Sequence, residues 1–551
     1  MALEESLLPV AAVLAPATTA ALIVILRRLP AVRDAVLVIG AAVTFAMILA
    51  MLPGALRGEV ATTSLGELIP GIELSLTADA MGMIFGLLAS LLWVLAGFYA
   101  IGYMRGDGAT NQTRFYAFYA LCLSTAFAVA FAGDLLTFFI AYELLTITTY
   151  PLVTHKGDAK AIAAGRTYLG YLLSGGVLVL LAMAIVFATT GQLSFEAGGF
   201  VADHVSSGML ILVFALFAIG FGTKAGLMPL HAWLPGAMVA PTPVSALLHA
   251  VAVVKGGVFA VGRMIGFVVG PGALAQIGVQ TALSAVAAAT ILVASIIALR
   301  QDHLKRRLAY STIAHLAFIV LGFSLASETA FEGALFHIVN HGALKITLFF
   351  AAGAIHIAAH KDYVSQLDGI GRRMPFTMVA FAVASYGLAG LPPMGGFLSK
   401  WHLVLGALEA GQPVFAAVMV GSGLLTAGYL FPIVYRAFFK PSPDAVPPAP
   451  ASGPVGDAEV VEPTPVGAGA APTGTPQVVE AAEASAPAAT LTVGPDDVAD
   501  HHHDDHGEAS ASMVVPLCLT AALGLLLGLG DLTGIYDLAA KAAAAVIGGG
   551  P

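Results

Sequence analysis

The sequence carries little charge. Only 10% of its 551 residues are Asp, Glu, Lys or Arg, whereas a soluble domain carries about 25%. Hydrophobic residues make up 58% of the chain, and the mean hydropathy is +0.89. This balance excludes an ordinary soluble enzyme and indicates a membrane protein that crosses the bilayer many times.

Several patterns that carry chemistry elsewhere are absent. The two cysteines, Cys122 and Cys518, lie in separate apolar runs and indicate no disulfide framework, metal knuckle or iron–sulfur cluster. The sequence has no Gly-x-x-x-x-Gly-Lys-Ser/Thr loop and no basic patch interleaved with aromatic residues. We therefore expect no cofactor and no nucleic-acid partner, and an ion gradient or a partner subunit must supply the energy.

What the sequence does contain is a series of long apolar runs. Because a helix needs about 20 residues to cross a bilayer, they predict an all-α polytopic membrane protein with about 14 transmembrane helices. Prolines interrupt the seventh and twelfth runs, at Pro229, Pro235, Pro392 and Pro393. Paired interruptions of this kind indicate a transporter built from two inverted repeats, with the ion path at the breaks.

The runs divide the chain into five parts. Residues 1–114 hold helices 1–3, residues 115–268 the first five-helix repeat (helices 4–8), and residues 269–440 the second (helices 9–13). Residues 512–551 hold the final helix and a tail. Basic clusters fall on alternate loops, which places those loops in the cytoplasm and both termini outside. Arg263, near the outer end of the eighth run, does not fit this rule, and residues 53–79 form an acidic outer loop.

Residues 441–511 differ from the rest, being rich in Pro, Ala, Gly and acids. Such a segment cannot bury enough apolar surface to fold, so we expect a disordered cytoplasmic loop. Its histidines could bind Zn²⁺ or Ni²⁺. A solvated linker is the favoured interpretation, because nothing fixes the geometry of His501, His502, His503 and His506.

Charged residues inside the apolar runs need a reason, since each costs roughly 2.5–3.5 kcal/mol at the bilayer centre. Glu143 lies inside the fifth run and Lys224 ends the seventh. An acid and an amine lose less hydration energy when buried as a pair than when buried apart. We expect Glu143 and Lys224 to pair. A proton-exchanging pair is favoured over a purely structural one, because more ionisable groups follow.

His337, His341 and Lys345 follow one another at intervals of four, which places them on one stripe of a helix. A lone histidine on an apolar face is usually a core residue, but three stacked titratable groups resemble a proton relay. A metal site is the less favoured alternative, because no facing carboxylate is evident.

Further ionisable residues lie in other runs. Lys400 follows the second proline break. His249 and Lys255, in the eighth run, could link the two halves of the ion path, one half at each proline break. His315 is a weak candidate, because the tenth run is expected to cover residues 308–326, which places His315 close to the cytoplasmic end. Asp134 is expected to cap the fifth helix. His231 either belongs to the ion path or hydrogen-bonds to backbone groups that the nearby prolines leave without a helical partner.

Several of these segments resemble one known family. They are Gly133-Asp-Leu-Leu-Thr-Phe-Phe-Ile-Ala-Tyr-Glu143, Ala240-Pro-Thr-Pro-Val-Ser-Ala-Leu-Leu-His249, Arg306-Arg-Leu-Ala-Tyr-Ser-Thr-Ile313 and Gly390-Leu-Pro-Pro-Met-Gly-Gly-Phe-Leu-Ser-Lys400. They resemble the proton-conducting antiporter-like subunits shared by Mrp-type cation/proton antiporters, complex I and membrane-bound hydrogenases, and the D subunit of Mrp antiporters most of all. The resemblance covers roughly residues 80–440.

The resemblance implies a fourteen-helix core, a Glu143–Lys224 pair, a central Lys255 and a terminal Lys400. It also implies work within a hetero-oligomer. The stripe at His337, His341 and Lys345 departs from a typical D subunit. In this feature the chain is closer to the distal subunit of complex I, or to the A-type subunit of Mrp antiporters. The 441–511 segment has no counterpart in the family pattern.

The leading hypothesis is a proton-translocating subunit of a multisubunit Na⁺ or K⁺/proton antiporter in a bacterial inner membrane. Its partners would be other membrane subunits. The first alternative is a proton-pumping subunit of a redox-driven complex, in which case the chain would be part of a translocase enzyme. The second is a helical scaffold whose charges only bind neighbouring subunits.

Overall fold

The computed structural model describes residues 2–69, 72–442, 507–531 and 533–547. Nearly all of the predicted loop at 441–511 lies outside the described residues, as do His501, His502, His503 and His506. Residues 1–442 and 507–551 form one compact unit, to which everything below refers.

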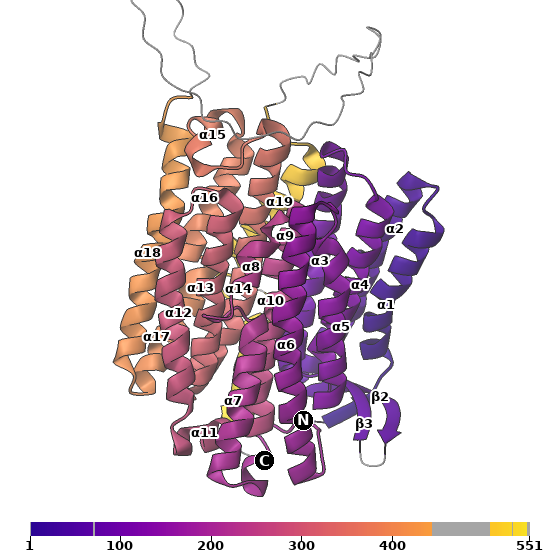
Figure 1. The fold of residues 1–551 in the computed structure, drawn as a ribbon, viewed down its shortest axis with the longest axis vertical. Helices are drawn as coiled ribbons and strands as arrows, with labels where there is room; N and C mark the ends of the chain where they lie inside the picture. Colours follow the sequence, from indigo (N-terminus) through magenta and orange to yellow (C-terminus); the bar gives the residue numbers. More distant parts are fainter. Residues whose placement is uncertain (1, 70–71, 443–506, 532, 548–551) are drawn as a thin grey trace, which may run out of the picture. The chain divides into compact units, whose positions relative to one another are not determined.

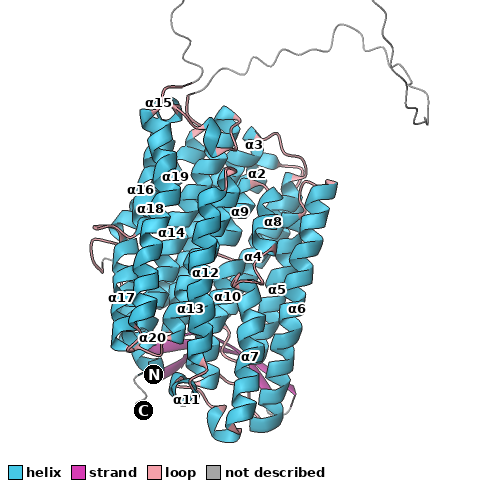
Figure 2. Ribbon diagram, turned by 60° about the vertical axis from the view of Figure 1, so that its left-hand side comes forward, coloured by secondary structure: helices cyan, strands magenta, loops and turns pink. Residues whose placement is uncertain are grey.

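Helices dominate the described residues (Figures 1 and 2). Twelve runs are long and apolar enough to cross a membrane, and two shorter apolar helices complete the fourteen predicted spans. The twelve are α1 (Leu8–Ile25), α2 (Pro30–Arg57), α3 (Ala80–Gly106), α4 (Gln112–Phe131), α5 (Leu135–Val153), α6 (Ala159–Thr190), α7 (Ser207–Lys224), the run Thr242–Val269, α12 (Gln280–Arg300), α13 (Leu304–Ser324), α14 (Glu328–Ala359) and α18 (Pro413–Phe439). The shorter two are α16 (Pro375–Ala389) and α19 (Ala511–Leu526).

Short helices connect or extend these spans. They are η1 (Ala202–His204), α8 (Trp233–Gly236), η2 (Ala237–Val239), α11 (Pro271–Ile277), η4 (Val364–Gln366), α15 (Ile370–Arg373), α17 (Gly395–Glu409) and α20 (Ile535–Ile547). The last of these, α20, lies in the predicted tail and packs against α14 and α3.

The predicted breaks in the seventh and twelfth spans are confirmed. The seventh span stops with α7 at Lys224, and helix resumes only with α8, so that Pro229 lies in the gap and Pro235 in the short helix. The twelfth span consists of α16 and α17, with Pro392 and Pro393 between them. Proline ends a helix because its ring removes an N–H donor and clashes with the preceding turn.

The eighth span carries a third break that the sequence did not predict. The run Thr242–Val269 consists of α9 (Thr242–Ala250), α10 (Val253–Arg263) and a π-helical turn, η3 (Met264–Val269). Val251 and Ala252 leave helical geometry between α9 and α10, with no proline at either position. The interruption separates His249 from Lys255.

A small sheet replaces the predicted acidic loop at 53–79. It contains β1 (Ala2–Glu5), β2 (Glu59–Ile69) and β3 (Ile72–Ala78) in that order. β1 runs parallel to β2, and β2 pairs antiparallel to β3 from Ala61 opposite Ala78. The hydroxyl and β-branched residues of this segment favour strands. Figure 2 shows the strands at one end of the helices, close to α20.

Two polar residues at the sheet end have structural roles. Asp134 caps α5, with its carboxylate 2.7 Å from the amide of Thr137, as predicted. Arg263, which broke the pattern of basic loops, is paired rather than free. Its guanidinium donates two hydrogen bonds to the carboxylate of Asp79, which also caps α3 through the amide of Gly82.

Replacing Asp79 by Asn should destabilise the protein by about 3 kcal/mol, because it leaves the buried guanidinium of Arg263 without a counter-charge. Asparagine still caps a helix, so the loss isolates the ion pair. The measurement is thermal unfolding of the purified protein in mild detergent.

The control is Glu59→Gln, which breaks the exposed pair between Arg57 and Glu59. Exposed pairs contribute little, so this variant should unfold with the wild type. Equal unfolding temperatures for all three proteins would contradict the role of Asp79 as the counter-charge of Arg263.

Candidate functional site

Most titratable side chains of the predicted path lie on the most buried helices. The run Thr242–Val269 is buried throughout, and α13 nearly so, whereas α1 and α2 are mostly exposed. Less than one tenth of each cation or histidine of the predicted path is exposed. This set comprises Lys224, His249, Lys255, His337, His341, Lys345 and Lys400.

Lys255 and His341 form the central contact. Lys255 Nζ lies 2.6 Å from His341 Nδ1, and both side chains are fully buried. Lys255 comes from α10, just after the break between α9 and α10, and His341 comes from the middle of α14. An amine and an imidazole in hydrogen-bond contact can hand a proton from one to the other, because each can act as donor or acceptor.

His315 belongs to the same cluster. Its Nδ1 lies 3.1 Å from His337 Nε2, and its ring centroid is 5.5 Å from that of His341. His337 in turn contacts the hydroxyl of Ser399 through its Nδ1, at 2.9 Å. His315, from α13, therefore stands between the two histidines of α14, on one side of the predicted stripe.

The prediction that His315 lies near the cytoplasmic end was wrong, because the predicted helix start was wrong. The tenth run was predicted to begin at residue 308, but α13 begins at Leu304, which moves His315 a full turn deeper into the span. Its burial is complete. A hydropathy window excludes the polar stretch Leu304-Lys-Arg-Arg307, although it forms the first turn of α13. Counting such a basic stretch as the start of the helix would have placed His315 correctly.

Lys345 lies on the other side of His341. Its ammonium group donates to the Ser311 hydroxyl at 2.7 Å, and that hydroxyl lies 3.0 Å from the phenol of Tyr429. Ser311 and Tyr429 were not predicted, since hydroxyl residues are common in membrane helices. Together they carry hydrogen bonding from α14 through α13 to α18.

Lys400 is held by backbone and not by an acid. Its ammonium group donates to the carbonyls of Leu388 and Ala389, at 2.7 and 3.3 Å. These carbonyls are free because α16 ends there, with Gly390 in the left-handed region at φ +86°. A helix C-terminus attracts a cation through its dipole. The second proline break thus creates the acceptors that hold Lys400.

Lys224 and Glu143 are neighbours without direct contact. Lys224 donates to the carbonyl of Tyr142 at 2.5 Å and lies 3.2 Å from the centre of that tyrosine ring. Glu143 points toward Gly176 on α6, and its Oε1 is buried without a hydrogen-bond partner. The two charges act on each other, yet among the described residues no Glu143 oxygen comes within 4.0 Å of Lys224 Nζ.

His249 is buried but lies apart from the cluster. Its ring is 4.8 Å from that of Phe349, and its Nδ1 has no hydrogen-bond partner. His315 Nε2 and His341 Nε2 are likewise buried and unpartnered. Buried polar atoms without protein partners are the places where internal water binds.

The described residues offer no cluster of three or more His, Cys, Asp or Glu suited to a metal ion. The three stacked histidines are engaged with one another, with Lys255 and with Ser399. The arrangement therefore suits proton transfer among nitrogen and oxygen atoms.

The fold and this buried row define a polytopic membrane protein with a band of titratable side chains through its middle. Residues 132–426 match the family model described as NADH:quinone oxidoreductase/Mrp antiporter, transmembrane. The chain belongs to this family.

Two relatives illustrate its breadth. Over 379 residues the chain is 37% identical to NADH-quinone oxidoreductase subunit N of Desulforudis audaxviator, covering 68% of this chain and 75% of that protein. Over 392 residues it is 32% identical to a probable K⁺/H⁺ antiporter subunit, of the A/B type, from Rhizobium meliloti. That match covers 68% of this chain but only 38% of that protein.

The fold is also that of solved membrane complexes. A chain of the Mrp complex from a Dietzia species superposes with a TM-score of 0.77 at 21% identity, covering 98% of both chains. A chain of respiratory complex I from Thermus thermophilus gives a TM-score of 0.75 at 22% identity, covering 98% of this chain and 99% of that one.

The Glu143 side chain depends on the absence of a side chain at Gly176. A Cβ at Gly176 would overlap Glu143 Oε1, so Gly176→Ala should displace the carboxylate. This displacement should offset the roughly 1 kcal/mol that alanine gains over glycine in a helix, so the variant should unfold at a lower temperature than an alanine variant at an open position of α6. Thermal unfolding in detergent measures the difference.

Gly170→Ala is the matched control, because it lies on the same helix with nothing within 4 Å of its would-be Cβ. It should be neutral or slightly stabilising. If Gly176→Ala unfolds at the same temperature as Gly170→Ala, the carboxylate of Glu143 does not lie against Gly176.

Proposed function

We propose that this chain is a proton-translocating subunit of a multisubunit monovalent cation (Na⁺ or K⁺)/proton antiporter. Protons would move along the buried row, with His315 added to the predicted residues. The row comprises Glu143, Lys224, His249, Lys255, His315, His337, His341, Lys345 and Lys400. The observation that carries the proposal is the contact of Lys255 with His341, next to the paired rings of His315 and His337.

The row would conduct by electrostatic displacement. It holds four amines and a single carboxylate, so a proton that loads one amine disfavours charge on the next. Lys255 would pass its proton to His341, and His315 and His337 would carry it toward Ser399 and Lys400. Water at the unpartnered nitrogen atoms of His315 and His341 would close the gaps.

The two proline breaks would open half-paths to opposite sides of the membrane. Pro229 and Pro235 mark the first, beside Lys224, and Pro392 and Pro393 mark the second, beside Lys400. The two five-helix repeats, at residues 115–268 and 269–440, would each supply one half-path. The chain would lie in a bacterial inner membrane with both termini outside, among other membrane subunits.

A second candidate function is proton pumping in a redox-driven complex. The 37% identity to a NADH-quinone oxidoreductase subunit N supports it. The proton row would serve in either assembly, and the partners decide between them. Mass spectrometry of the subunits that co-purify in mild detergent separates the two functions, since only a redox complex would bring iron–sulfur subunits.

Replacing Lys255 by Ala should lower proton translocation by at least about tenfold, because it removes the central proton carrier of the row. The measurement is dye-reported proton movement in inverted membrane vesicles that contain the whole complex, on addition of NaCl or KCl and separately of NADH. Subunit composition is checked by affinity purification.

Arg28→Gln is the control, since it removes an exposed cation outside the row and should leave translocation unchanged. Normal assembly with normal translocation in Lys255→Ala would exclude a transport role for the row and favour a scaffold.

Replacing His315 by Gln should also lower translocation, by about tenfold, because glutamine keeps hydrogen bonding but cannot carry a proton. His204→Gln is the matched control, since His204 is exposed and outside the row. Wild-type translocation in His315→Gln would exclude His315 from the proton path and leave only the stripe on α14.

A further inference from the structure

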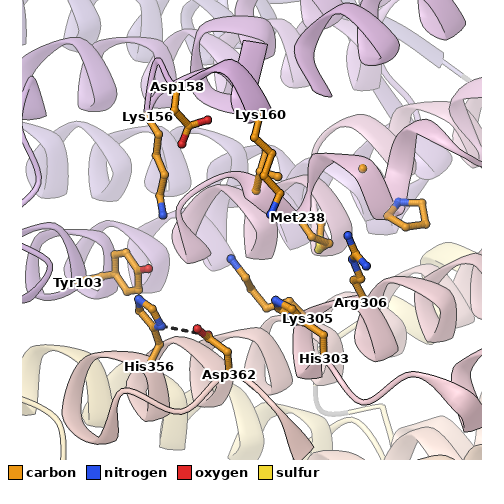
Figure 3. A pocket seen from close by; sticks show the side chains of 13 residues that line it. Tyr103, Lys156, Asp158, Lys160, Met238, His303, Lys305, Arg306, His356 and Asp362 are labelled. Atoms are coloured by element: carbon orange, nitrogen blue, oxygen red, sulfur yellow. Dashed lines mark hydrogen bonds and ion pairs between the residues drawn. The ribbon is translucent and has the colours of Figure 1, made fainter. Parts of the chain in front are cut away.

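A cavity of about 220 Å³ lies at the end of the helices where the basic loops gather, which we call the basic face. It is bounded by the start of α6, the short helices α8 and η2, the start of α13 and the end of α14. Figure 3 shows four cationic side chains directed toward a common space, from Lys156, Lys160, Lys305 and Arg306. No part of the proton row lines this cavity.

These four cations lack acidic partners. Among the described residues, no carboxylate oxygen lies within 4.0 Å of the charged nitrogens of Lys156, Lys160, Lys305 or Arg306. Lys305 donates to the carbonyl of Ala240 at 3.1 Å, which satisfies a hydrogen bond but neutralises no charge. Lys156 and Lys305 also repel each other. The lining therefore holds four cations against the two carboxylates of Asp158 and Asp362, which leaves a surplus of positive charge.

Two acids reach the cavity, but each is already engaged. The carboxylate of Asp158 caps α6 by accepting from the amide of Ala161 at 2.6 Å. Asp362 is bound by His356 at 3.0 Å, the contact drawn in Figure 3, and this bond holds the pKa of Asp362 below its usual value. Burial and the charge of Lys305 lower the pKa of His303 at the rim, as expected where the potential is positive.

We propose that this cavity binds a phosphate-bearing anion, either free phosphate or the headgroup of an anionic phospholipid. Ammonium and guanidinium groups form their strongest hydrogen bonds with phosphate oxygens. Helices α6 and α13 both begin at the cavity, and their N-terminal dipoles add to the attraction.

The size and the surroundings fit this class of ligand. A water molecule occupies about 30 Å³, so the cavity has room for a phosphate group with several waters. Basic pockets between membrane helices on the cytoplasmic side bind lipid headgroups in this way. α6 also exposes Leu173, Val177 and Leu180 farther along the helix, where an acyl chain could lie. An alkali cation is disfavoured, because the four cations outnumber the two carboxylates of the lining.

The test is a binding measurement on the full chain in the complex with which it purifies, after removal of lipid in detergent. Equilibrium dialysis with radiolabelled inorganic phosphate reports the free anion. Native mass spectrometry after addition of phosphatidylglycerol or phosphatidylcholine reports the lipid. We expect wild type to retain phosphate, phosphatidylglycerol or both, and to prefer phosphatidylglycerol to phosphatidylcholine.

The double variant Lys160→Gln/Arg306→Gln should bind at least about tenfold more weakly, since each charge-assisted contact is worth more than 1 kcal/mol. Both side chains are exposed, so the fold should tolerate the changes. Arg28→Gln, an exposed cation on the same face but outside the cavity, is the matched control and should bind like wild type.

Binding of phosphate alone assigns the site to a free anion, and binding of phosphatidylglycerol alone assigns it to a lipid headgroup. Either result supports the proposal. It is overturned if wild type binds neither probe, or if the double variant binds as tightly as Arg28→Gln. The readout is binding and not transport, so it stands whatever the outcome for the proton row.

Discussion

The structure depends on how it buries the four lysines of the row, in which Glu143 is the one carboxylate. Each buried ammonium group must find acceptors, because an unsatisfied charge in the bilayer is too costly to keep. Lys224 uses a backbone carbonyl and a tyrosine ring, Lys255 an imidazole, Lys345 a hydroxyl and Lys400 two carbonyls. None of the four is fixed by an acid within 4.0 Å among the described residues. Neutral acceptors leave an amine free to give up its proton, which a tight ion pair would resist.

This requirement explains the irregular helices. Carbonyls without a partner in their own helix occur where a helix ends, and irregular backbone is tolerated only inside the protein or beside water. The end of α16 supplies such carbonyls to Lys400. The gap between α9 and α10 sets Lys255 at the start of a new helix, facing α14. Arg263 differs from these lysines. Its guanidinium donates two hydrogen bonds to the carboxylate of Asp79, and such an ion pair holds the sheet end in place and does not favour proton transfer.

The sequence predicts much of this fold and part of the site. Hydropathy locates the spans because membrane helices need long apolar runs, and prolines locate the breaks beside Lys224 and Lys400. The gap at Val251 and Ala252 escapes prediction, since neither residue breaks helices and the surroundings impose the geometry. The sheet escapes because short strands between helices leave a weak pattern.

Contacts between spans were harder to predict. His315 depends on a helix start that polar residues conceal, and its partners come from α14, more than twenty residues away. Glu143 was expected to contact Lys224, but its carboxylate lies against α6, in the space that Gly176 leaves open. The sequence shows which ionisable residues lie in apolar runs, whereas the packing of the helices decides which of these residues contact one another.

The central claim is that the buried row is hydrated and continuous. The most direct measurement is a map of the assembled complex in lipid nanodiscs at a resolution that shows ordered water. The account predicts water within hydrogen-bond distance of Glu143 Oε1, His249 Nδ1, His315 Nε2 and His341 Nε2. Apolar side chains packed against these four atoms, with no water between the members of the row, would contradict it.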